Sequence, residues 1–584
     1  ISILMINSET NIMFAAVFRR SYPFKSNFLR KIYICCFVLL SVTVYGHQVR
    51  AASICAIATA HPDATAAGCE ILRNGGNAFD AAIAVTAALA VVEPYSSGLG
   101  GGGFYLLHLA ESERKVFIDA REMAPQAVSE KIYLDGSGEV IPGLSREGPL
   151  AAAIPGIPSA ISHLSKYYAR LPLTDTLRPA ISLAKEGFLV DPRFVRAVGW
   201  VEKRIRKFPI TENIFFKAAQ PFGLGDILKQ PDLGSTLEIL SRDIDSFYVG
   251  EIAQEMVDFV IDAGGNWTLS DLAGYKVKER EPVSIDFYGS KITTAPLPSS
   301  GGLVMAQVFN ILSEISFFEQ SADIKAHLVI EAMRRGYNDR ARFMGDPDFN
   351  DIKTNVLLSP EYARIRAKSI ELHSATDSLA LPSVFDLDIE GEETTHFSII
   401  DDSGNRVAAT LSINGPFGSG MVAGDTGVLL NNHMDDFSIG IGKGNAYDLV
   451  GNRVNGIKPG KRPLSSMSPT FVESEEGVLV LGTPGGSRII SMVVLSVLEH
   501  LSNLGSDPEN VVALPRYHHQ YLPDRVQIEP ESFDQSWISS LEALGHNVQV
   551  YRRKWGNMQA IFCDNYTHKC VTLNDPRGKA GVVF

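Results

Sequence analysis

One stretch of the sequence places a threonine in a setting that suits nucleophilic chemistry. Thr394 opens a strand-like segment that runs to Ile400, and it follows a polar, acidic stretch at about 370–393 that is typical of an exposed linker. A threonine hydroxyl is a weak nucleophile without a neighbouring base, but the α-amine of an N-terminal threonine is such a base. Cleavage of the Glu393–Thr394 bond would create that amine. A polar linker before a strand is also common in proteins without this chemistry.

Further motifs along the chain narrow the interpretation. Five of them occur in a fixed order, namely Asp119-Ala120-Arg121-Glu122-Met123-Ala124-Pro125, Thr394-Thr395-His396, 431–438 (Asn-Asn-His-Met-Asp-Asp-Phe-Ser), 462–470 (Arg-Pro-Leu-Ser-Ser-Met-Ser-Pro-Thr) and Pro484-Gly485-Gly486-Ser487-Arg488. Together they resemble the γ-glutamyltranspeptidases (glutathione hydrolases), a family of N-terminal-nucleophile hydrolases. The resemblance covers roughly residues 53–584, and five ordered motifs make it specific.

The resemblance implies a self-processing enzyme. A single precursor would cleave itself between Glu393 and Thr394 into a large subunit, residues 53–393, and a small subunit, residues 394–584. Thr394 would then attack the γ-glutamyl amide of glutathione or another γ-glutamyl compound. The acyl group would pass to water or to an amino acid or dipeptide acceptor. Nucleophile, base and oxyanion donors would all be protein groups, so we expect no cofactor and no metal.

The same resemblance implies the roles of individual residues. The amides of Gly485 and Gly486 would form the oxyanion hole, since fixed N–H donors stabilise a developing negative charge. Ser412, commonly threonine in the family, would steady the nucleophile. The substrate residues would be Arg121, Ser465 and Ser466 at the α-carboxylate, and Asp436 and Asn414 at the α-ammonium. Taken without the family, the glycine pair is an ordinary turn and Arg121 a surface charge.

Two positions modify this picture. The family usually has Gln or Glu where this chain has His433. A neutral imidazole can accept a hydrogen bond from an ammonium, whereas an imidazolium would repel it. The glycine-rich stretch 438–463 includes Tyr447 and matches the place of a lid loop in some members. A lid would favour small donors such as glutathione, although a plain mobile loop remains an alternative.

The elements around these residues indicate an α/β (α+β) protein. Residues 56–92 are interpreted as two helices separated at Asn74–Asn77, and the glycine run that ends at Gly103 precedes a strand at Phe104–Leu109. The run lacks the spacing of a dinucleotide site, so we expect its glycines to permit a close approach of backbones. Strands are expected at 115–119, 394–400, 406–413 and 477–481, a helix at 488–501, and a mainly helical middle at 150–390. The family implies a four-layer αββα sandwich formed jointly by both subunits.

Composition and the N-terminus bear on the compartment. The chain has 584 residues and a net charge of −13, which argues against a nucleic-acid partner. Residues 1–52 carry a basic stretch and an apolar run from Ile32 to Tyr45, as in a signal peptide or an uncleaved signal anchor. We therefore expect a periplasmic or extracellular protein, with membrane anchoring through this segment as an alternative. Pairing of Cys563 with Cys570 is left open, and the adjacent His518 and His519 are not expected to bind a metal.

Two other functions share parts of this pattern. A related acylase could cleave another amide, such as a β-lactam side chain, but such a substrate has no ammonium for Asp436 to bind. A non-catalytic homologue that is never processed would not require Thr394, Gly485 and Gly486, all of which are intact. A γ-glutamyltransferase and glutathione hydrolase is the function that the residues favour.

Overall fold

The computed structural model describes residues 55–578 apart from 382–393, 440–444, 446–448, 450, 452 and 504. These residues belong to one compact unit that spans Ile54–Phe584. The expectations for residues 1–52, Glu393 and Tyr447 lie outside the described residues.

The first of two large sheets joins strands from distant parts of the chain. Its order is β1 (Ala56–Thr59), β11 (Thr395–Ile400), β12 (Arg406–Ser412), β2 (Gly102–Leu109), β3 (Arg114–Ala120) and β8 (Lys278–Arg280). All neighbours are antiparallel, and β11 and β12 form the expected hairpin, with Thr395 opposite Leu411. The strand expected at 115–119 is confirmed as β3, which pairs with β2.

The second sheet is also antiparallel and is built from both halves of the sequence. Its order is β19 (Cys570–Asn574), β18 (Gln559–Asp564), β14 (Gly477–Gly482), β13 (Thr470–Glu473), β10 (Ser290–Thr294) and β9 (Val283–Phe287). The helix expected at 488–501 is confirmed as α18 (Arg488–Ser502), which follows β14 directly.

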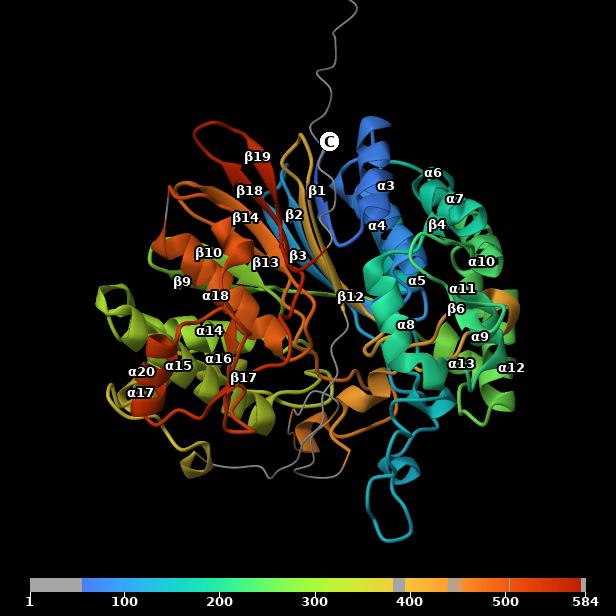
Figure 1. Ribbon diagram of the computed structural model, residues 1–584. Coiled ribbons are helices and arrows are strands. Elements are labelled where there is room, and N and C mark those ends of the chain that lie inside the picture. The colour runs from blue at the N-terminus through green and yellow to red at the C-terminus, as the bar shows by residue number, and fades with distance from the viewer. Residues whose placement is uncertain are drawn as a thin grey trace, which may run out of the picture. The chain divides into compact units, whose positions relative to one another are not determined.

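The two sheets pack face to face between two helical layers (Figure 1). Side chains alternate along β2, so that Tyr105 and Leu107 face α4 (Ala78–Val92) while Phe104 and Leu106 pack in the core between the sheets. The second sheet is covered by α14 (Gly301–Ser313), α15 (Ala322–Phe343) and α18. This arrangement confirms the four-layer αββα sandwich.

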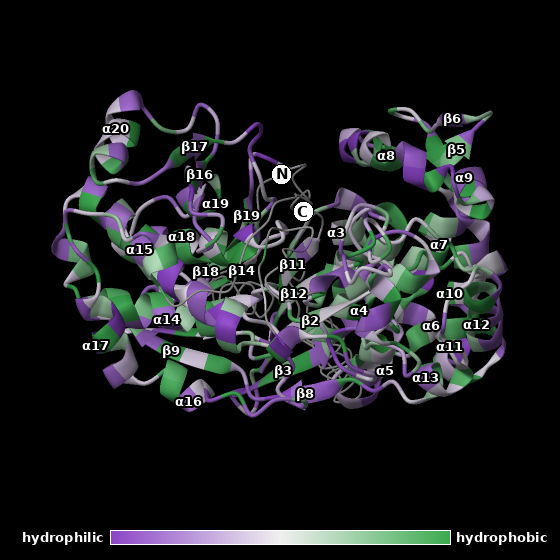
Figure 2. Ribbon diagram, turned by 90° about the horizontal axis from the view of Figure 1, so that it is seen from below, coloured by the Kyte–Doolittle hydropathy of each residue, from purple (hydrophilic) through white to green (hydrophobic). Residues whose placement is uncertain are grey.

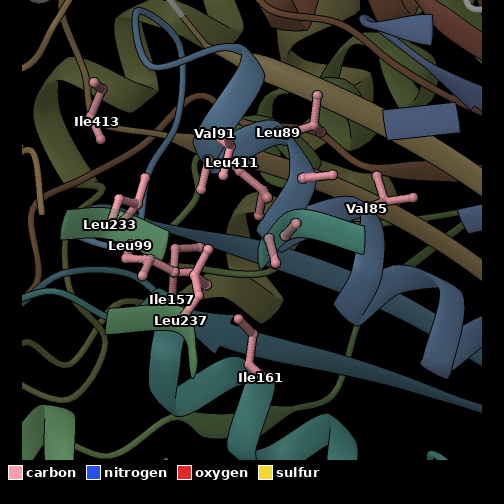
Figure 3. Close-up of a cluster of buried hydrophobic side chains, with 14 of the residues drawn as sticks. Val85, Leu89, Val91, Leu99, Ile157, Ile161, Leu233, Leu237, Leu411 and Ile413 are labelled. Carbon is pink, nitrogen blue, oxygen red and sulfur yellow. The ribbon is translucent and has the colours of Figure 1, made fainter. Parts of the chain in front are cut away.

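The core on the α4 side unites elements far apart in the sequence. In Figure 3, Val85 and Leu89 of α4 lie near Leu411 of β12, with apolar side chains of α5 (Ile157–Tyr167) and α10 (Pro231–Arg242) around them. Every residue of α4 is buried, which explains its continuous apolar run. Figure 2 shows both hydrophobic and hydrophilic residues on outer helices such as α12 (Glu251–Asp262).

The remaining elements surround this sandwich. The helices are α3 (Pro62–Arg73), α6 (Leu173–Thr176), α7 (Arg178–Glu186), α8 (Pro192–Ile205), α9 (Pro209–Phe215), α11 (Ser246–Val249), α13 (Leu269–Ala273), α16 (Thr354–Leu357), α17 (Pro360–Lys368), α19 (Asn510–Ala513) and α20 (Gln535–Ala543). Short strands are β4 (Phe188–Leu189), β5 (Phe216–Lys217), β6 (Gln220–Pro221), β7 (Ile227–Leu228), β15 (Tyr517–His518), β16 (Val526–Ile528) and β17 (Val548–Val550).

One sequence expectation needs correction and two are confirmed. Residues 56–59 form β1 rather than the start of a helix, because they pair with β11 in the first sheet. The middle, 150–390, is mainly helical as expected and also supplies β9 and β10 to the second sheet. The glycine run does permit a close approach, since a Cβ on Gly101 would lie 2.3 Å from the carbonyl oxygen of Ser412.

Two disulfides staple the unit. Cys563 and Cys570 are cross-strand partners in the β18–β19 hairpin and are bonded, which resolves the pairing that the sequence left open. Cys55 is bonded to Cys69 of α3, a pair that the sequence reasoning did not identify. Within the described ranges, every helix is too short or too polar to cross a membrane.

Candidate functional site

Thr394 lies immediately before β11, where the hairpin register brings it beside the end of β12. Its Oγ1 is 3.3 Å from the Oγ of Ser412, the last residue of β12. The residue is 4% exposed and lines a small cavity. The predicted nucleophile and its predicted hydroxyl neighbour are therefore brought together.

The next residue anchors this strand to the first helical layer. Thr395 donates its hydroxyl hydrogen to Oε2 of Glu93, which follows α4, at 2.8 Å. The other oxygen of Glu93 accepts from the hydroxyl of Tyr95 at 3.1 Å and pairs with Arg193 at 3.2 Å. Glu93 and Thr395 are both fully buried, so these bonds form away from water. The sequence reasoning did not single out Glu93.

The glycine pair turns the chain between β14 and α18. Gly485 and Gly486 have φ values of 140° and 55°, and the amide of Arg488 bonds back to the carbonyl of Gly485 at 3.0 Å. Such φ values favour glycine over any residue with a Cβ. Gly486 and Ser487 line the cavity that holds Thr394. The glycine pair therefore stands at the N-terminus of α18, where the helix dipole makes negative charge favourable.

Arg121 is fully buried at the end of β3. Its Nε donates to the carbonyl of Pro463 at 3.1 Å, and its Nη2 pairs with the carboxylate of Asp436. Arg121 and Asp436, which were predicted to belong to one site, are therefore in contact. The pair is held between a strand end and the loop that precedes Ser465.

His433 contacts the neighbour of Arg121. Its Nδ1 lies 2.7 Å from Oε1 of Glu122, and its Nε2 lies 4.0 Å from Oδ2 of Asp436. The first contact has the distance of an ion pair, but its angles do not make a hydrogen bond, so it is electrostatic in character. His433 and Glu122 are both buried, and the contact turns the other ring nitrogen towards Asp436.

The serine pair and Asn414 complete the predicted set. The carbonyl of Ser465 accepts from both the amide and the hydroxyl of Ser300, at 2.8 and 2.7 Å. The hydroxyl of Ser466 is buried and has no hydrogen-bond partner among the described residues. Asn414 has a φ of 74°, and its side chain donates to the carbonyl of Asn432 at 3.0 Å.

One cavity collects most of these residues. Its lining includes nine of the residues expected from the sequence, namely Arg121, Thr394, Ser412, Asn414, His433, Asp436, Ser465, Ser466 and Gly486. Gly485 is not part of the lining. Leu449, from the stretch interpreted as a lid, and Arg340 of α15 also line the cavity. The sequence reasoning missed Arg340 because nothing local distinguishes it from the other arginines of its helix.

Several other buried histidines lie outside this cavity lining. His396 packs between the sheets beside Gly482, where burial lowers its pKa to about 3. His327, Glu331 and His546 form a buried group whose ligating atoms lie within 4.8 Å of one another. Each of these atoms is already hydrogen-bonded, for example His327 Nδ1 to His546 Nε2 at 2.8 Å and His327 Nε2 to the carbonyl of Glu371 at 2.8 Å. His518 and His519 are similarly hydrogen-bonded within the protein.

Comparisons with known proteins place these features in context. A family model described as Gamma-glutamyltranspeptidase matches residues 64–584. The glutathione hydrolase proenzyme of Pseudomonas sp. (strain A14) is 40% identical over 84% of this chain and 85% of that protein. The proenzyme of the same name from Escherichia coli (strain K12) is 38% identical, over 86% and 87% respectively.

Two solved structures resemble the fold. The cephalosporin acylase of Bacillus halodurans superposes with a TM-score of 0.78 at 27% identity, covering 90% of this chain and 95% of that chain. The γ-glutamyltranspeptidase of Helicobacter pylori superposes with a TM-score of 0.53 at 35% identity, covering 55% of this chain and 93% of that chain.

Proposed function

This chain belongs to the γ-glutamyltranspeptidase family and is an enzyme of that type, and we propose that Thr394 is its nucleophile in γ-glutamyl transfer and glutathione hydrolysis. The observation that carries the proposal is the position of Thr394. Its hydroxyl lies beside Ser412 in the same cavity as Gly486, Arg121 and Asp436. This arrangement supports the proposal, because the proposed nucleophile, one proposed oxyanion donor and the proposed substrate-binding pair line the same cavity.

The first proposed reaction is cleavage of the chain itself. The Thr394 hydroxyl attacks the Glu393 carbonyl, the amide is replaced by an ester, and water releases the ester to leave a free α-amine on Thr394. The products are a large subunit of residues 53–393 and a small subunit of residues 394–584. The first sheet interleaves β11 and β12 of the small subunit between β1 and β2 of the large subunit, so both subunits stay together after cleavage.

The second proposed reaction uses the new amine as the base. It accepts the proton of the Thr394 hydroxyl while the oxygen attacks the γ-glutamyl amide, and it returns a proton to the leaving amine. The amides of Gly485 and Gly486 stabilise the oxyanion. The φ values of the two glycines and their position before α18 support this role. Fixed N–H donors stabilise such a transition state by roughly 3–4 kcal/mol. Water or an amino acid or dipeptide then accepts the acyl group.

Recognition of the γ-glutamyl head follows from buried polar atoms that lack hydrogen bonds. In the part of the chain that the structure describes, Nη1 of Arg121 and Oγ of Ser466 are buried without hydrogen-bond partners, and Nη1 lies 3.6 Å from Oε2 of Glu122. Both suit an α-carboxylate, with Ser465 beside them. Asp436 suits the α-ammonium, with Asn414 at the same wall. Buried polar groups are costly unless paired, which supports a ligand or water at these atoms.

His433 is proposed to accept one hydrogen bond from the α-ammonium. The Glu122 carboxylate attracts the Nδ1–H tautomer, which leaves the Nε2 lone pair on the side of Asp436. A neutral imidazole thereby replaces the amide or carboxylate that is usual in the family. A donor KM that is the same in His433→Gln and His433→Phe would contradict this role.

We also propose that the enzyme is exported. Residues 1–52 have the pattern of a signal segment, and two disulfides suit an oxidising compartment. Leu449, from the glycine-rich stretch, lines the cavity, which supports a preference for small donors such as glutathione.

The proposal is tested by trapping the acyl-enzyme. Purified protein is mixed with a γ-glutamyl anilide, quenched in acid, and its small subunit is analysed by peptide mass spectrometry. We expect one γ-glutamyl group on the peptide that begins at Thr394. We expect less of this label in Ser412→Ala. Release of the aniline with the label on any other residue would contradict the proposal.

The acylase alternative has one observation in its favour, the high structural similarity to a cephalosporin acylase. The retained Arg121–Asp436 pair opposes it, because a β-lactam side chain without an α-amino acid head leaves both charges unused. Parallel assays with a γ-glutamyl anilide and a cephalosporin side-chain amide separate the two functions.

A further inference from the structure

Arg340 is a buried cation inside the cavity that no sequence motif assigns. It lies near the C-terminal end of α15, and its side chain is 5% exposed. Its one hydrogen bond within the described residues runs from Nε to the hydroxyl of Ser300 at 2.9 Å. None of the described carboxylates lies within 4.0 Å of its guanidinium nitrogens.

A guanidinium in this position lacks the compensation that buried charges normally have. Burial lowers the pKa of Arg340 to about 10, and the nearby Arg121 acts in the same direction. Asp436 offsets this at longer range, but its carboxylate already pairs with Arg121. Buried charges are usually paired, and an unpaired one in a ligand cavity is most simply explained by a ligand of opposite charge.

The contacts of Arg340 place it next to the serine pair. Ser300 accepts from Arg340 and donates to the carbonyl of Ser465, so one hydroxyl links the guanidinium to the loop that carries Ser466. The guanidinium thus borders the same part of the cavity as the unpartnered Ser466 hydroxyl. A carboxylate held by Ser466 would have Arg340 as a neighbour.

The charges in the cavity support the same conclusion. The cavity is lined by two guanidinium groups, of Arg121 and Arg340, and by one carboxylate, of Asp436. A γ-glutamyl head adds one ammonium and one carboxylate. As the ammonium draws Asp436 away from Arg121, the substrate carboxylate supplies the anion that the two guanidinium groups require.

We propose that Arg340 is a second carboxylate-binding residue, which acts with Arg121 and Ser466 on the α-carboxylate of the γ-glutamyl donor. The inference rests on the proposed function and extends it by assigning a residue of the large subunit to substrate recognition. Arg340 contacts substrate without taking part in bond making, so its removal should impair donor selection more than self-cleavage.

The test compares two donors that differ only at the α-carbon substituent. One is a γ-glutamyl anilide with its free α-carboxylate, and the other carries an α-carboxamide in its place. The quantity measured is the ratio of kcat/KM for the two donors in wild type, Arg340→Gln and Arg340→Lys. Arg342→Gln is the matched control, since it makes the same change on the same helix outside the cavity lining.

We expect the preference for the carboxylate donor to fall about tenfold or more in Arg340→Gln, less in Arg340→Lys, and not at all in Arg342→Gln. A purely structural role would reduce both donors equally and leave the ratio unchanged, which would overturn the inference. If Arg340→Gln fails to mature, Arg340→Lys decides, because a ratio equal to that of wild type then contradicts the proposal. A wild-type protein that uses neither donor would instead refute the proposed function.

Discussion

Replacement of Glu93 by glutamine tests how the nucleophile is positioned. The substitution keeps the volume of the side chain and removes one negative charge. It affects three bonds at once, to the hydroxyl of Thr395 at 2.8 Å, the hydroxyl of Tyr95 at 3.1 Å and the guanidinium of Arg193 at 3.2 Å. Because Thr395 is adjacent to Thr394, any shift of this anchor moves the nucleophile.

The magnitude follows from these contacts. A hydrogen bond to a charged group contributes about 1.5–3 kcal/mol and a neutral one about 0.5–1.5 kcal/mol, so each bond loses about 1 kcal/mol when the charge is removed. The glutamine side chain also places an NH₂ group where one carboxylate oxygen of Glu93 accepted hydrogen bonds, so that a donor faces a donor. We expect a loss of about 2–3 kcal/mol in total. If half of it appears in the activation barrier, self-cleavage slows about five- to tenfold.

The assay follows disappearance of the precursor band after purification of freshly synthesised protein, for wild type, Glu93→Gln and Thr395→Val. Thr395→Val removes the donor and keeps the shape, so it should slow cleavage in the same direction. Arg114→Gln, which disrupts an exposed ion pair with Glu279, is the control and should cleave at the wild-type rate. Cleavage of Glu93→Gln at the wild-type rate, with a lowered Tm, would refute a positioning role and leave only a structural one.

Three further predictions concern other parts of the molecule. In Ser466→Ala, the lost hydroxyl has no partner among the described residues, so Tm should be unchanged while the donor KM rises about fivefold, the equivalent of about 1 kcal/mol; an unchanged KM in steady-state assays would contradict its role. In the double variant Cys563→Ser and Cys570→Ser, loss of a short cross-link should lower the free energy of unfolding by about 2.5 kcal/mol in urea titrations without loss of activity; equal stability with and without the bond would contradict this. Burial lowers the pKa of His500 to about 4, below its value of 6.5 in the unfolded chain. The contribution of the neutral side chain to stability is therefore complete above pH 6.5. It declines by about 1.4 kcal/mol per pH unit as the pH falls from 6.5 towards 4, because the unfolded chain binds the proton first. His500→Phe, which keeps an aromatic ring against Phe562, should therefore show a shallower decline of urea stability between pH 6.5 and 5; parallel curves would rule out this contribution.

The sequence predicted most strongly those features that depend on local patterns. The hairpin at Thr395 and Arg406 follows from alternation around a turn, and the start of α18 follows from the glycines after an apolar strand. Ordered motifs located seven of the residues that line the cavity, and the family resemblance added Ser412 and Asn414. The motifs identified the residues, and the fold brings these residues close together in space.

The sequence did not predict features that arise from long-range packing. β1 is only four residues long, and its identity as a strand depends on β11, more than 300 positions away. Glu93, Arg340 and the Cys55–Cys69 bond lacked any local signature, because each is defined by its partners in the fold. For Cys55 and Cys69, the one usable signal was two cysteines close together in a chain expected to be exported.

The most direct test of the central claim is N-terminal sequencing of each band on a denaturing gel, for wild type and Thr394→Ala. We expect two bands from the wild type, with the smaller beginning Thr-Thr-His-Phe, and a single uncleaved band from a folded Thr394→Ala. A folded wild-type protein that stays in one piece, or a small band that begins elsewhere, would contradict the assignment of Thr394 as an N-terminal nucleophile.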